Sequence, residues 1–450
     1  MKTSALGRIT LAAGIAALTA GVVPATAYAD DATVERKTLP VLVEFTDSAF
    51  EHPDQVKAGT PESYFGTGDT SLAQYLSDAS RGRYKLVPAV EEKVIGPIKL
   101  PMSAAGCKHG DIRARTTEAL AARGLVQGED YDSLAMTFPA QATKCPWAGL
   151  ATMPGPITWF NLYGTGSALY VLGHEFGHNL GFGHQGRTTC TDGDLVNCKD
   201  NGASAKSLLG NGNESTGFSA PEHIRAGWLN DSEAPKITES GTYTLRSLHG
   251  EGGGVRALDI PMGEDRLVVE YRHEAGRFDT DLEGVHAYRV PKDSYGSASL
   301  IDMTEANKTS ENDAPADADA ITSLTDEAGK VSVAVMSSGD GRATVQVALD
   351  GDELTDAPAE EETAKPDPEH TGTDTVEHDT VKDTGAGDSA GSDAETQSDG
   401  SKPAAEAGGS SEDLAATGGS SATLPVAVGG AALVAAGTAA LVVMRRRKRA

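Results

Sequence analysis

Three histidines and a glutamate in HEFGHNLGFGH, residues 174–184, have the spacing HExxHxxGxxH. Residues four apart on a helix share one face, so His174 and His178 can present their imidazoles to one metal ion. Gly181 can adopt a positive φ, end the helix and turn the chain so that His184 supplies a third nitrogen. Catalytic zinc sites typically have three protein ligands and a water, whereas structural zinc sites have four protein ligands. We therefore expect one catalytic Zn²⁺ here.

Glu175 follows the first of these histidines and is the expected catalytic residue. A carboxylate at this place in an HExxH helix can take a proton from water activated by the metal and return it to a leaving amine. Neutral imidazoles leave zinc with its full positive charge, which lowers the pKa of bound water and polarises a carbonyl group. The sequence therefore predicts peptide-bond hydrolysis, with proteins or peptides as substrates.

The helices and strands that must position the histidines and Glu175 are expected within a catalytic domain over residues 30–230, whose pattern indicates an α/β fold. Strand-like apolar runs alternate there with amphipathic helical segments, which is typical of an α/β-type domain. The expected strands are Leu39–Phe45 and Ser133–Pro139, and the expected helices are Ser71–Asp78, Asp111–Arg123 and Tyr163–Leu180, the last bearing His174 and His178.

A small all-β, sandwich-like domain is expected over residues 231–350. Short strand-like runs separated by Gly, Asp and Ser favour a sandwich or a barrel, and its default role is packing. The expected strands are Gly241–Leu245, Val255–Ile260, Arg266–Arg272, Gly284–Arg289, Val331–Met336 and Ala343–Leu349.

The first 29 residues have the pattern of a secretory signal peptide. Lys2 and Arg8 precede an apolar run, and Ala27-Tyr28-Ala29 fits a small-x-small cleavage site, so we expect cleavage after Ala29. About nine residues then remain before the first expected strand, which leaves no room for a folded pro-domain. We therefore expect activity without a latent stage, once the exported chain folds and captures zinc.

The other end of the chain carries three signals in a fixed order. Residues 351–413 are acidic and poor in large apolar residues, which predicts a disordered linker that can extend about 200 Å. Leu414-Ala415-Ala416-Thr417-Gly418, an uncharged segment over 422–444 and a basic tail follow. The segment is long enough to span a bilayer, and the basic residues would stay on the cytoplasmic side.

This order resembles the sorting signal of Gram-positive surface proteins, with an LAxTG variant of its pentapeptide. The resemblance implies cleavage by a sortase between Thr417 and Gly418, followed by attachment of Thr417 to peptidoglycan. A plain single-pass membrane anchor is the alternative. Residues 414–450 are thus assigned as a sorting signal of a secreted protein covalently attached to a Gram-positive cell wall.

The charge of the chain makes nucleic acid an unexpected partner. The chain has 450 residues, of which 38 are basic and 65 acidic. The signal peptide and the tail after Thr417 contain seven of the basic residues and no acidic one. Their removal leaves 31 basic against 65 acidic residues, a net charge of −34. Such a surface lacks the basic footprint that phosphate binding requires. We expect a soluble monomeric catalytic portion.

The four cysteines are expected to form disulfides, in keeping with export. Cys190 and Cys198 are close in sequence, and Cys107 and Cys145 are the remaining pair, although the sequence permits three pairings. Cysteine zinc ligands are the competing interpretation, but the spacing lacks a CxxC. Ca²⁺ binding by Asp192, Asp194 and Asp200 is conceivable but lacks a recognised ligand pattern, so a solvated loop is the better interpretation.

The zinc motif resembles the signature of the metzincin clan of zinc endopeptidases. Other segments resemble its immune inhibitor A and gametolysin-like branches over roughly residues 38–290. The block 149–159, with GLATMPG and Thr158-Trp159, resembles the strand and turn before the zinc helix. The block 217–229, with GFSAPE and Gly-Trp-Leu, resembles the end of the catalytic domain, and Tyr75-Leu76 with residues 80–84 resembles an early helix and strand.

One departure from that resemblance concerns the methionine-containing turn that the clan has beneath the metal. This chain has Ser207-Leu208-Leu209-Gly210-Asn211-Gly212, so Leu209, followed by Gly210, stands at the place of the methionine. The methionine packs below the metal without binding it, and leucine has a similar volume. The resemblance therefore implies retained activity.

Two further histidines are expected to have no ligand role. His223 is predicted to lie at the surface or to support the site from outside the ligand set, and His109 is predicted to be an exposed residue at a helix start. The alternatives to a zinc endopeptidase are a surface adhesin on an inactive protease fold and a peptidoglycan peptide hydrolase. The presence of Glu175 argues against the adhesin, because binding alone has no need of that carboxylate.

Overall fold

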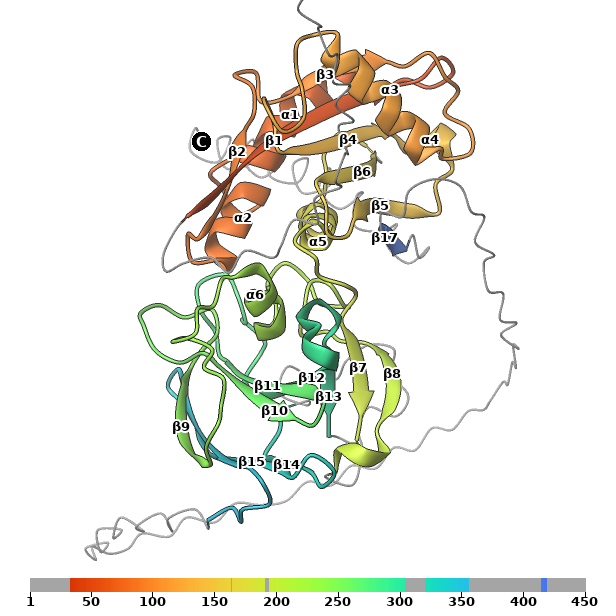
Figure 1. Cartoon of the computed structure of the whole chain (residues 1–450). Helices are drawn as coiled ribbons and strands as arrows, with labels where there is room; N and C mark the ends of the chain where they lie inside the picture. Colours follow the sequence, from red (N-terminus) through yellow and green to blue (C-terminus); the bar gives the residue numbers. More distant parts are fainter. Residues whose placement is uncertain (1–32, 163, 191–193, 304–319, 356–413, 419–450) are drawn as a thin grey trace, which may run out of the picture. The chain divides into compact units, whose positions relative to one another are not determined.

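The computed structural model of the chain describes residues 33–162, 164–190, 194–303, 320–355 and 414–418 (Figure 1). The predicted signal peptide, the apolar segment 422–444 and almost all of the predicted linker lie outside the described residues. Among the described residues, no helix is both long and apolar enough to cross a membrane.

The N-terminal part of the described chain is built on a mixed sheet with the strand order β17-β5-β6-β4-β1-β2, and β3 pairs with β1 beyond the end of β2. Strands β2, β3 and β4 run parallel to β1, and β6 runs parallel to β4, whereas β5 is antiparallel to β6. The strands are β1 (Val34–Glu44), β2 (Tyr84–Pro88), β3 (Ile95–Lys99), β4 (Ser133–Pro139), β5 (Trp147–Thr152), β6 (Ile157–Leu162) and β17 (Leu414–Gly418).

Helices pack on both faces of this sheet, as the alternation of side chains along β4 shows. Leu134, Met136 and Phe138 lie in one apolar cluster with residues of α3, while Ala135 lies in another cluster with residues of α2 and α5. Burial on both faces explains why all seven residues of β4 are buried. The helices are α1 (Pro53–Phe65), α2 (Leu72–Ala79), α3 (His109–Ala121), α4 (Ala140–Thr143) and α5 (Leu169–Asn179).

The predicted elements of this region are largely confirmed, with one clear correction. Strand β4 has the predicted bounds, and α2 begins after Ser71, whose hydroxyl accepts from the backbone N–H of Gln74. The predicted helix over Tyr163–Leu180 is wrong at its start, because α5 begins at Leu169. Strand β6 continues to Leu162, and Gly164 has a φ of 85°, a conformation that an α-helix cannot contain. Tyr163 lies outside the described residues.

Two further sheets follow the zinc motif. The six-stranded sheet has the order β10-β11-β12-β13-β7-β8, and the four-stranded sheet has the order β14-β15-β16-β9. Between α5 and β9 lies the short helix α6 (Ala220–Ala226). The strands are β7 (Gly186–Thr189), β8 (Lys199–Ala203), β9 (Gly241–Arg246), β10 (Ala257–Met262), β11 (Asp265–Arg272), β12 (Gly284–Val290), β13 (Ser299–Asp302), β14 (Ser323–Asp326), β15 (Val331–Gly339) and β16 (Arg342–Ala348).

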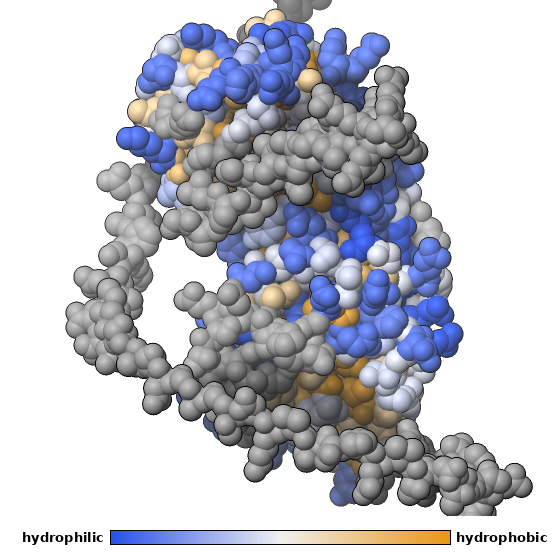
Figure 2. All heavy atoms as spheres, turned by 180° about the vertical axis from the view of Figure 1, so that it is seen from behind, coloured by the Kyte–Doolittle hydropathy of each residue, from blue (hydrophilic) through white to orange (hydrophobic). Residues whose placement is uncertain are grey.

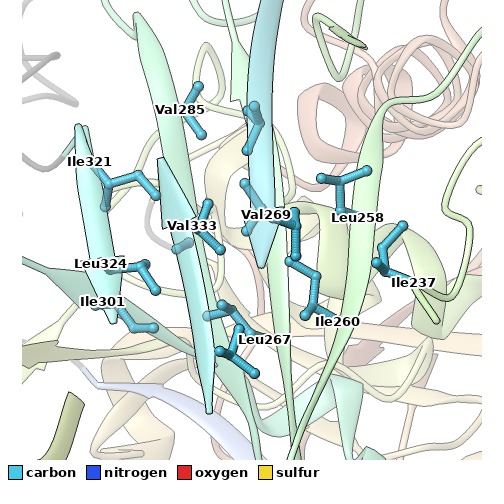
Figure 3. Close-up of a cluster of buried hydrophobic side chains, with 14 of the residues drawn as sticks. Ile237, Leu258, Ile260, Leu267, Val269, Val285, Ile301, Ile321, Leu324 and Val333 are labelled. Carbon is cyan, nitrogen blue, oxygen red and sulfur yellow. The ribbon is translucent and has the colours of Figure 1, made fainter. Parts of the chain in front are cut away.

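The apolar core of this second region lies between the two sheets. Leu267 and Val269 of β11 cluster with Val333 of β15 (Figure 3). The intervening Val268 belongs to a different cluster, which includes Ala220 of α6. The period-2 alternation of β11 therefore joins the four-stranded sheet on one face to α6 on the other.

A mixed α/β architecture with several sheets and few helices is thus confirmed. Strands β7 and β8 precede residue 230, the predicted end of the catalytic domain, yet they belong to the same sheet as β10–β13, and β7 runs parallel to β13. Residues 33–354 accordingly belong to one compact unit, together with β17. On the face shown in Figure 2, hydrophilic residues make up most of the described surface.

Candidate metal centre

Helix α5 and the turn after it bring the three histidines together. His174 and His178 lie one turn apart on α5, and the helix ends where Gly181 adopts a φ of 90°. The backbone N–H of Phe182 donates to the carbonyl of Gly177, which closes the helix end. His184 follows two residues later, so the glycine reverses the chain as its position in the motif predicts.

The ligand atoms of the three histidines converge to within 4.8 Å of one another. The ring centroids of His174 and His178 are 4.7 Å apart, and that of His184 lies 5.2 Å and 4.9 Å from them. Among the residues that the structure describes, this is the one group of three or more His, Cys, Asp or Glu side chains that could hold a metal ion. The predicted ligand set is therefore a real cluster in space.

Backbone carbonyls fix which nitrogen of each imidazole faces the centre. The Nδ1 atom of His174 lies 2.9 Å from the carbonyl oxygen of Leu208, and that of His178 lies 2.6 Å from the carbonyl oxygen of Phe182. Because a carbonyl can only accept, both Nδ1 atoms carry the proton, which leaves the Nε2 lone pairs available. Both Nε2 atoms are buried and have no hydrogen-bond partner in the protein. Such orphaned atoms fit a metal ion.

The surroundings keep these imidazoles neutral, which is the form that binds metals. The pKa of His174 is lowered to about 3, mainly by burial and also by the neighbouring His178 and His184, and burial lowers the pKa of His178 to about 4. Burial also lowers the pKa of His184. At neutral pH none of the three rings needs to lose a proton before it binds a metal.

The side chain of Glu175 is fully buried against Gly149 of β5, which has no side chain to obstruct it. A Cβ atom on Gly149 would lie 2.5 Å from both Cγ and Oε1 of Glu175, which is closer than side chains allow. Position 149, the first of the GLATMPG block, therefore needs glycine because Glu175 comes so close to it. Its backbone φ is not positive and would not by itself require glycine. The block that carries the family resemblance thus has a direct physical role in the site.

Replacing Gly149 by alanine should displace the Glu175 carboxylate and lower kcat/KM by about 100-fold, the effect of a displacement of about 1 Å at a reacting group. Peptide hydrolysis and thermal unfolding of the variant would measure this. Gly110→Ala is the matched control, because Gly110 lies in α3 with nothing near its hypothetical Cβ. Equal activity of the two variants would contradict this role of Gly149.

The turn at residues 207–212 packs beneath the ligand helix. The side chain of Leu209 is fully buried, and its Cδ2 atom lies 2.7 Å from the place of a Cβ on Gly177. Gly210 approaches the carbonyl of Ser204 so closely that no larger residue fits there. Leu209 therefore fills the space under α5 between the two helix histidines, the place that the resemblance gives to a methionine.

Leu209→Met should keep kcat/KM within about tenfold of the unchanged protein, because a volume-conserving exchange costs less than about 1.5 kcal/mol. Leu209→Ala is the contrasting variant and should lower the free energy of unfolding by about 2–5 kcal/mol through the cavity it leaves. Activity assays and urea unfolding would test both. A very large gain of activity in Leu209→Met would show that leucine impairs the site.

The closing block supports this turn through a buried carboxyl group. Both oxygens of Glu222 in α6 accept from the hydroxyl of Ser207, at 2.7 and 2.8 Å, and Oε2 accepts from the backbone N–H of Ser219 at 2.6 Å. Burial raises the pKa of Glu222 to about 7. The Ser-x-x-Glu capping pattern at 219–222 is the sequence signal for this residue.

A buried ionic cluster around Arg272 is the largest feature that sequence reasoning missed. The Arg272 guanidinium lies 2.6 Å from Asp279 and 3.0 Å from Glu270, and all three side chains are fully buried. It also donates to the carbonyls of Lys206 and Thr216, which flank the turn beneath α5. The sequence held only a weak signal for this cluster: Glu270 and Arg272 have opposite charges and lie two residues apart, on one face of β11.

His223 and His109 do not join the metal group. His223 is fully buried in α6, which excludes the surface position and leaves the alternative prediction of a residue outside the ligand set; its ring packs against Trp228 and His249. His109 is the first residue of α3, as predicted, but it is half-buried beside Trp159 and not exposed.

The predicted disulfides are confirmed, whereas the acidic loop shows no cation site in its described part. Cys107 bonds to Cys145, and Cys190 bonds to Cys198. Asp192 lies outside the described residues. Asp194 accepts from the backbone N–H of Val196 at the start of a short 3₁₀ helix. Neither Asp194 nor Asp200 belongs to a metal-binding group among the described residues.

Comparison with protein families places the chain in one of them. The family described as gametolysin peptidase M11 matches residues 52–278, just over half of the chain and the part that contains the histidine cluster. The chain belongs to this metallopeptidase family and is therefore a peptidase. No curated protein matches it.

Solved structures offer more distant likenesses. A chaperone–substrate complex is 18% identical, with a TM-score of 0.27, over 42% of this chain and 30% of that one, so the matched region spans less than a third of its length. Two crystal forms of wild type OgpA from Akkermansia muciniphila are 14% and 12% identical, each with a TM-score of 0.27. The matches cover 56% and 60% of this chain and 76% and 89% of those chains.

Proposed function

We propose that this peptidase is a zinc endopeptidase that hydrolyses extracellular proteins. The observation that carries the proposal is the convergence of His174, His178 and His184, two of them with Nδ1 fixed and Nε2 buried without a protein partner. Three neutral imidazoles suit zinc among the common metals and leave a position open for water.

The residues of the site have distinct roles in this proposal. When bound, zinc supplies a Lewis acid that polarises the scissile carbonyl and makes water a better nucleophile. The three histidines hold the metal, and the Leu208 and Phe182 carbonyls orient two of them. Glu175 takes the proton of the attacking water and delivers it to the leaving nitrogen. Gly149 and Leu209 keep Glu175 and α5 in place through the contacts described above.

We further propose that the enzyme works outside the cell on a tether. The signal-peptide pattern before Ala29 supports export, and the two disulfides suit an oxidising location. The order of LAATG, apolar segment and basic tail supports cleavage by a sortase after Thr417 and attachment of Thr417 to peptidoglycan. Mass spectrometry of wall fragments would test this: Thr417 should carry a peptidoglycan stem peptide, and Thr417→Ala should abolish it.

Removal of the metal should abolish peptide hydrolysis. The purified chain should hydrolyse casein or an unstructured peptide, lose at least about 100-fold in rate after treatment with a zinc chelator, and regain it with stoichiometric Zn²⁺. Metal analysis should give one zinc per chain in the active protein and none in His178→Ala. Hydrolysis that persists in metal-free protein would refute the proposal. Release of peptides from purified peptidoglycan, with intact casein, would favour the wall-hydrolase alternative.

A further inference from the structure

The pentapeptide of the proposed sorting signal forms a strand in the structure. Leu414–Gly418 is β17, which pairs antiparallel with β5 at the end of the first sheet (Figure 1). Leu414 lies opposite Thr152, Ala415 opposite Ala151 and Ala416 opposite Leu150. The other side of β5 pairs with β6. The segment thus occupies the edge of β5 that would otherwise be open among the described strands.

This edge borders the residues of the metal centre. Gly149, where a Cβ atom would collide with the side chain of Glu175, is opposite Thr417 in the register of β17. Helix α5, which carries Glu175 and two of the histidines, contacts both β5 and β17. The register shifts after Thr417, where Gly418 pairs with Trp147. The bond between Thr417 and Gly418 therefore lies at the part of β17 nearest to the catalytic glutamate along the strand.

The chemistry of the segment suits binding as an extended peptide. Main-chain hydrogen bonds supply affinity in strand addition, and LAATG has no charge and only one large side chain. That side chain, Leu414, is 43% exposed, so the pairing does not depend on a deep pocket for it. Because the segment belongs to the same chain, its binding to β5 is intramolecular and does not depend on the protein concentration.

We propose that Leu414–Gly418 is an internal competitor of the substrate: it occupies the outer edge of β5, where an extended substrate would add as a strand beside the metal centre, and holds the enzyme in a partly inhibited state until it is displaced. The kinetic part of this inference rests on the proposed function. The proposed inhibition also replaces the expectation, drawn from the sequence, that the enzyme has no latent stage and is active once it has folded and bound zinc. Because the same five residues are the proposed sortase signal, a sortase and the β5 edge compete for them, so anchoring and inhibition are coupled.

Occupancy can be measured without any catalytic activity. The test uses the full chain without its signal peptide, kept in mild detergent. It carries Glu175→Gln so that hydrolysis cannot consume the segment. In this chain, the pair Ala151→Cys and Ala415→Cys should form a disulfide. Directly opposed residues in antiparallel strands have the Cα separation that a disulfide requires. The matched control combines Ala151→Cys with Leu414→Cys, because Leu414 is opposite Thr152 and not Ala151, and successive strand residues point to opposite faces of the sheet. No cross-link in the first pair, or equal cross-linking in both, would overturn the proposal.

Competition is tested by kinetics in the otherwise unchanged full chain. Ala415→Pro with Ala416→Pro removes both backbone N–H groups at the centre of β17 and should lower KM for a peptide substrate by about 3–10-fold, with kcat unchanged, as expected when a weak intramolecular competitor is lost. The control, Ala404→Pro with Ala405→Pro, makes the same change in the linker and should leave KM unaltered. Intact mass would verify that the segment is still attached.

The two measurements separate the possible failures. A cross-link in the Glu175→Gln chain, together with no measurable hydrolysis by the zinc-loaded chain that keeps Glu175, would contradict the proposed function but leave the occupancy of β5 established. An active chain with no cross-link, or with a KM that the proline pair does not change, would overturn the inhibition and leave the proposed function intact.

Discussion

Glu175→Gln is expected to lower kcat by about 100- to 10,000-fold, which is the range for loss of a general base. Glutamine keeps the size of the side chain and one oxygen but cannot accept the proton of the attacking water. The change should therefore act on kcat, with KM nearly unchanged, because the proton transfer takes place after the peptide has bound. Steady-state hydrolysis of a fluorogenic peptide would give both parameters.

The control for this variant is its metal content. The nitrogen atoms that face the metal belong to His174, His178 and His184, so Glu175→Gln should still bind one zinc and unfold at nearly the same temperature. Loss of zinc together with loss of activity would mean that Glu175 acts in metal binding. A kcat within tenfold of the unchanged enzyme would eliminate Glu175 as the general base.

The ligand cluster could be predicted from the sequence because its geometry is local. His174 and His178 are fixed by the period of one helix, and Gly181 determines where the chain turns toward His184. The role of Gly149 could not be predicted, since its closeness to Glu175 depends on how β5 pairs with β6 and how α5 packs against both. Spacing predicts contacts within an element but not those between elements far apart in sequence.

The same limit explains why the sheets were less well predicted than their strands. Most strands after residue 230 are at or near their predicted positions, because alternation along β11 or β16 is visible in the sequence. Their partners were not foreseen: β7 joins β13 across more than a hundred residues. Likewise, LAATG has small residues with no period that would indicate a strand, and its pairing with β5 becomes visible only in three dimensions.

Arg272 shows most directly that the second region supports the site. It lies at the end of β11, and the carbonyls of Lys206 and Thr216 to which it donates bracket the turn that holds Leu209 under α5. Burial disfavours its charge, but Asp279 and Glu270 outweigh that cost and raise its pKa. These contacts give the later strands a structural role in the metal centre, beyond the packing role expected from sequence.

Arg272→Leu is accordingly expected to lower the free energy of unfolding by about 3–5 kcal/mol, because it leaves the carboxylates of Glu270 and Asp279 buried without their counter-charge. Zinc affinity should fall as well, since the turn at 207–212 loses two anchoring contacts. Urea unfolding and competitive zinc titration would measure the two effects.

Two comparisons decide whether buried charge is the cause. Arg289→Leu, in the neighbouring strand β12, breaks a pair with Asp265 in which Arg289 is half exposed, and should cost less than about 1 kcal/mol. Adding Glu270→Gln and Asp279→Asn to Arg272→Leu should recover part of the lost stability, because no buried charge then remains unpaired. The contacts with Lys206 and Thr216 would still be missing, so this triple variant should stay weak in zinc binding. Full recovery of zinc affinity would show that Arg272 stabilises the fold without positioning the turn.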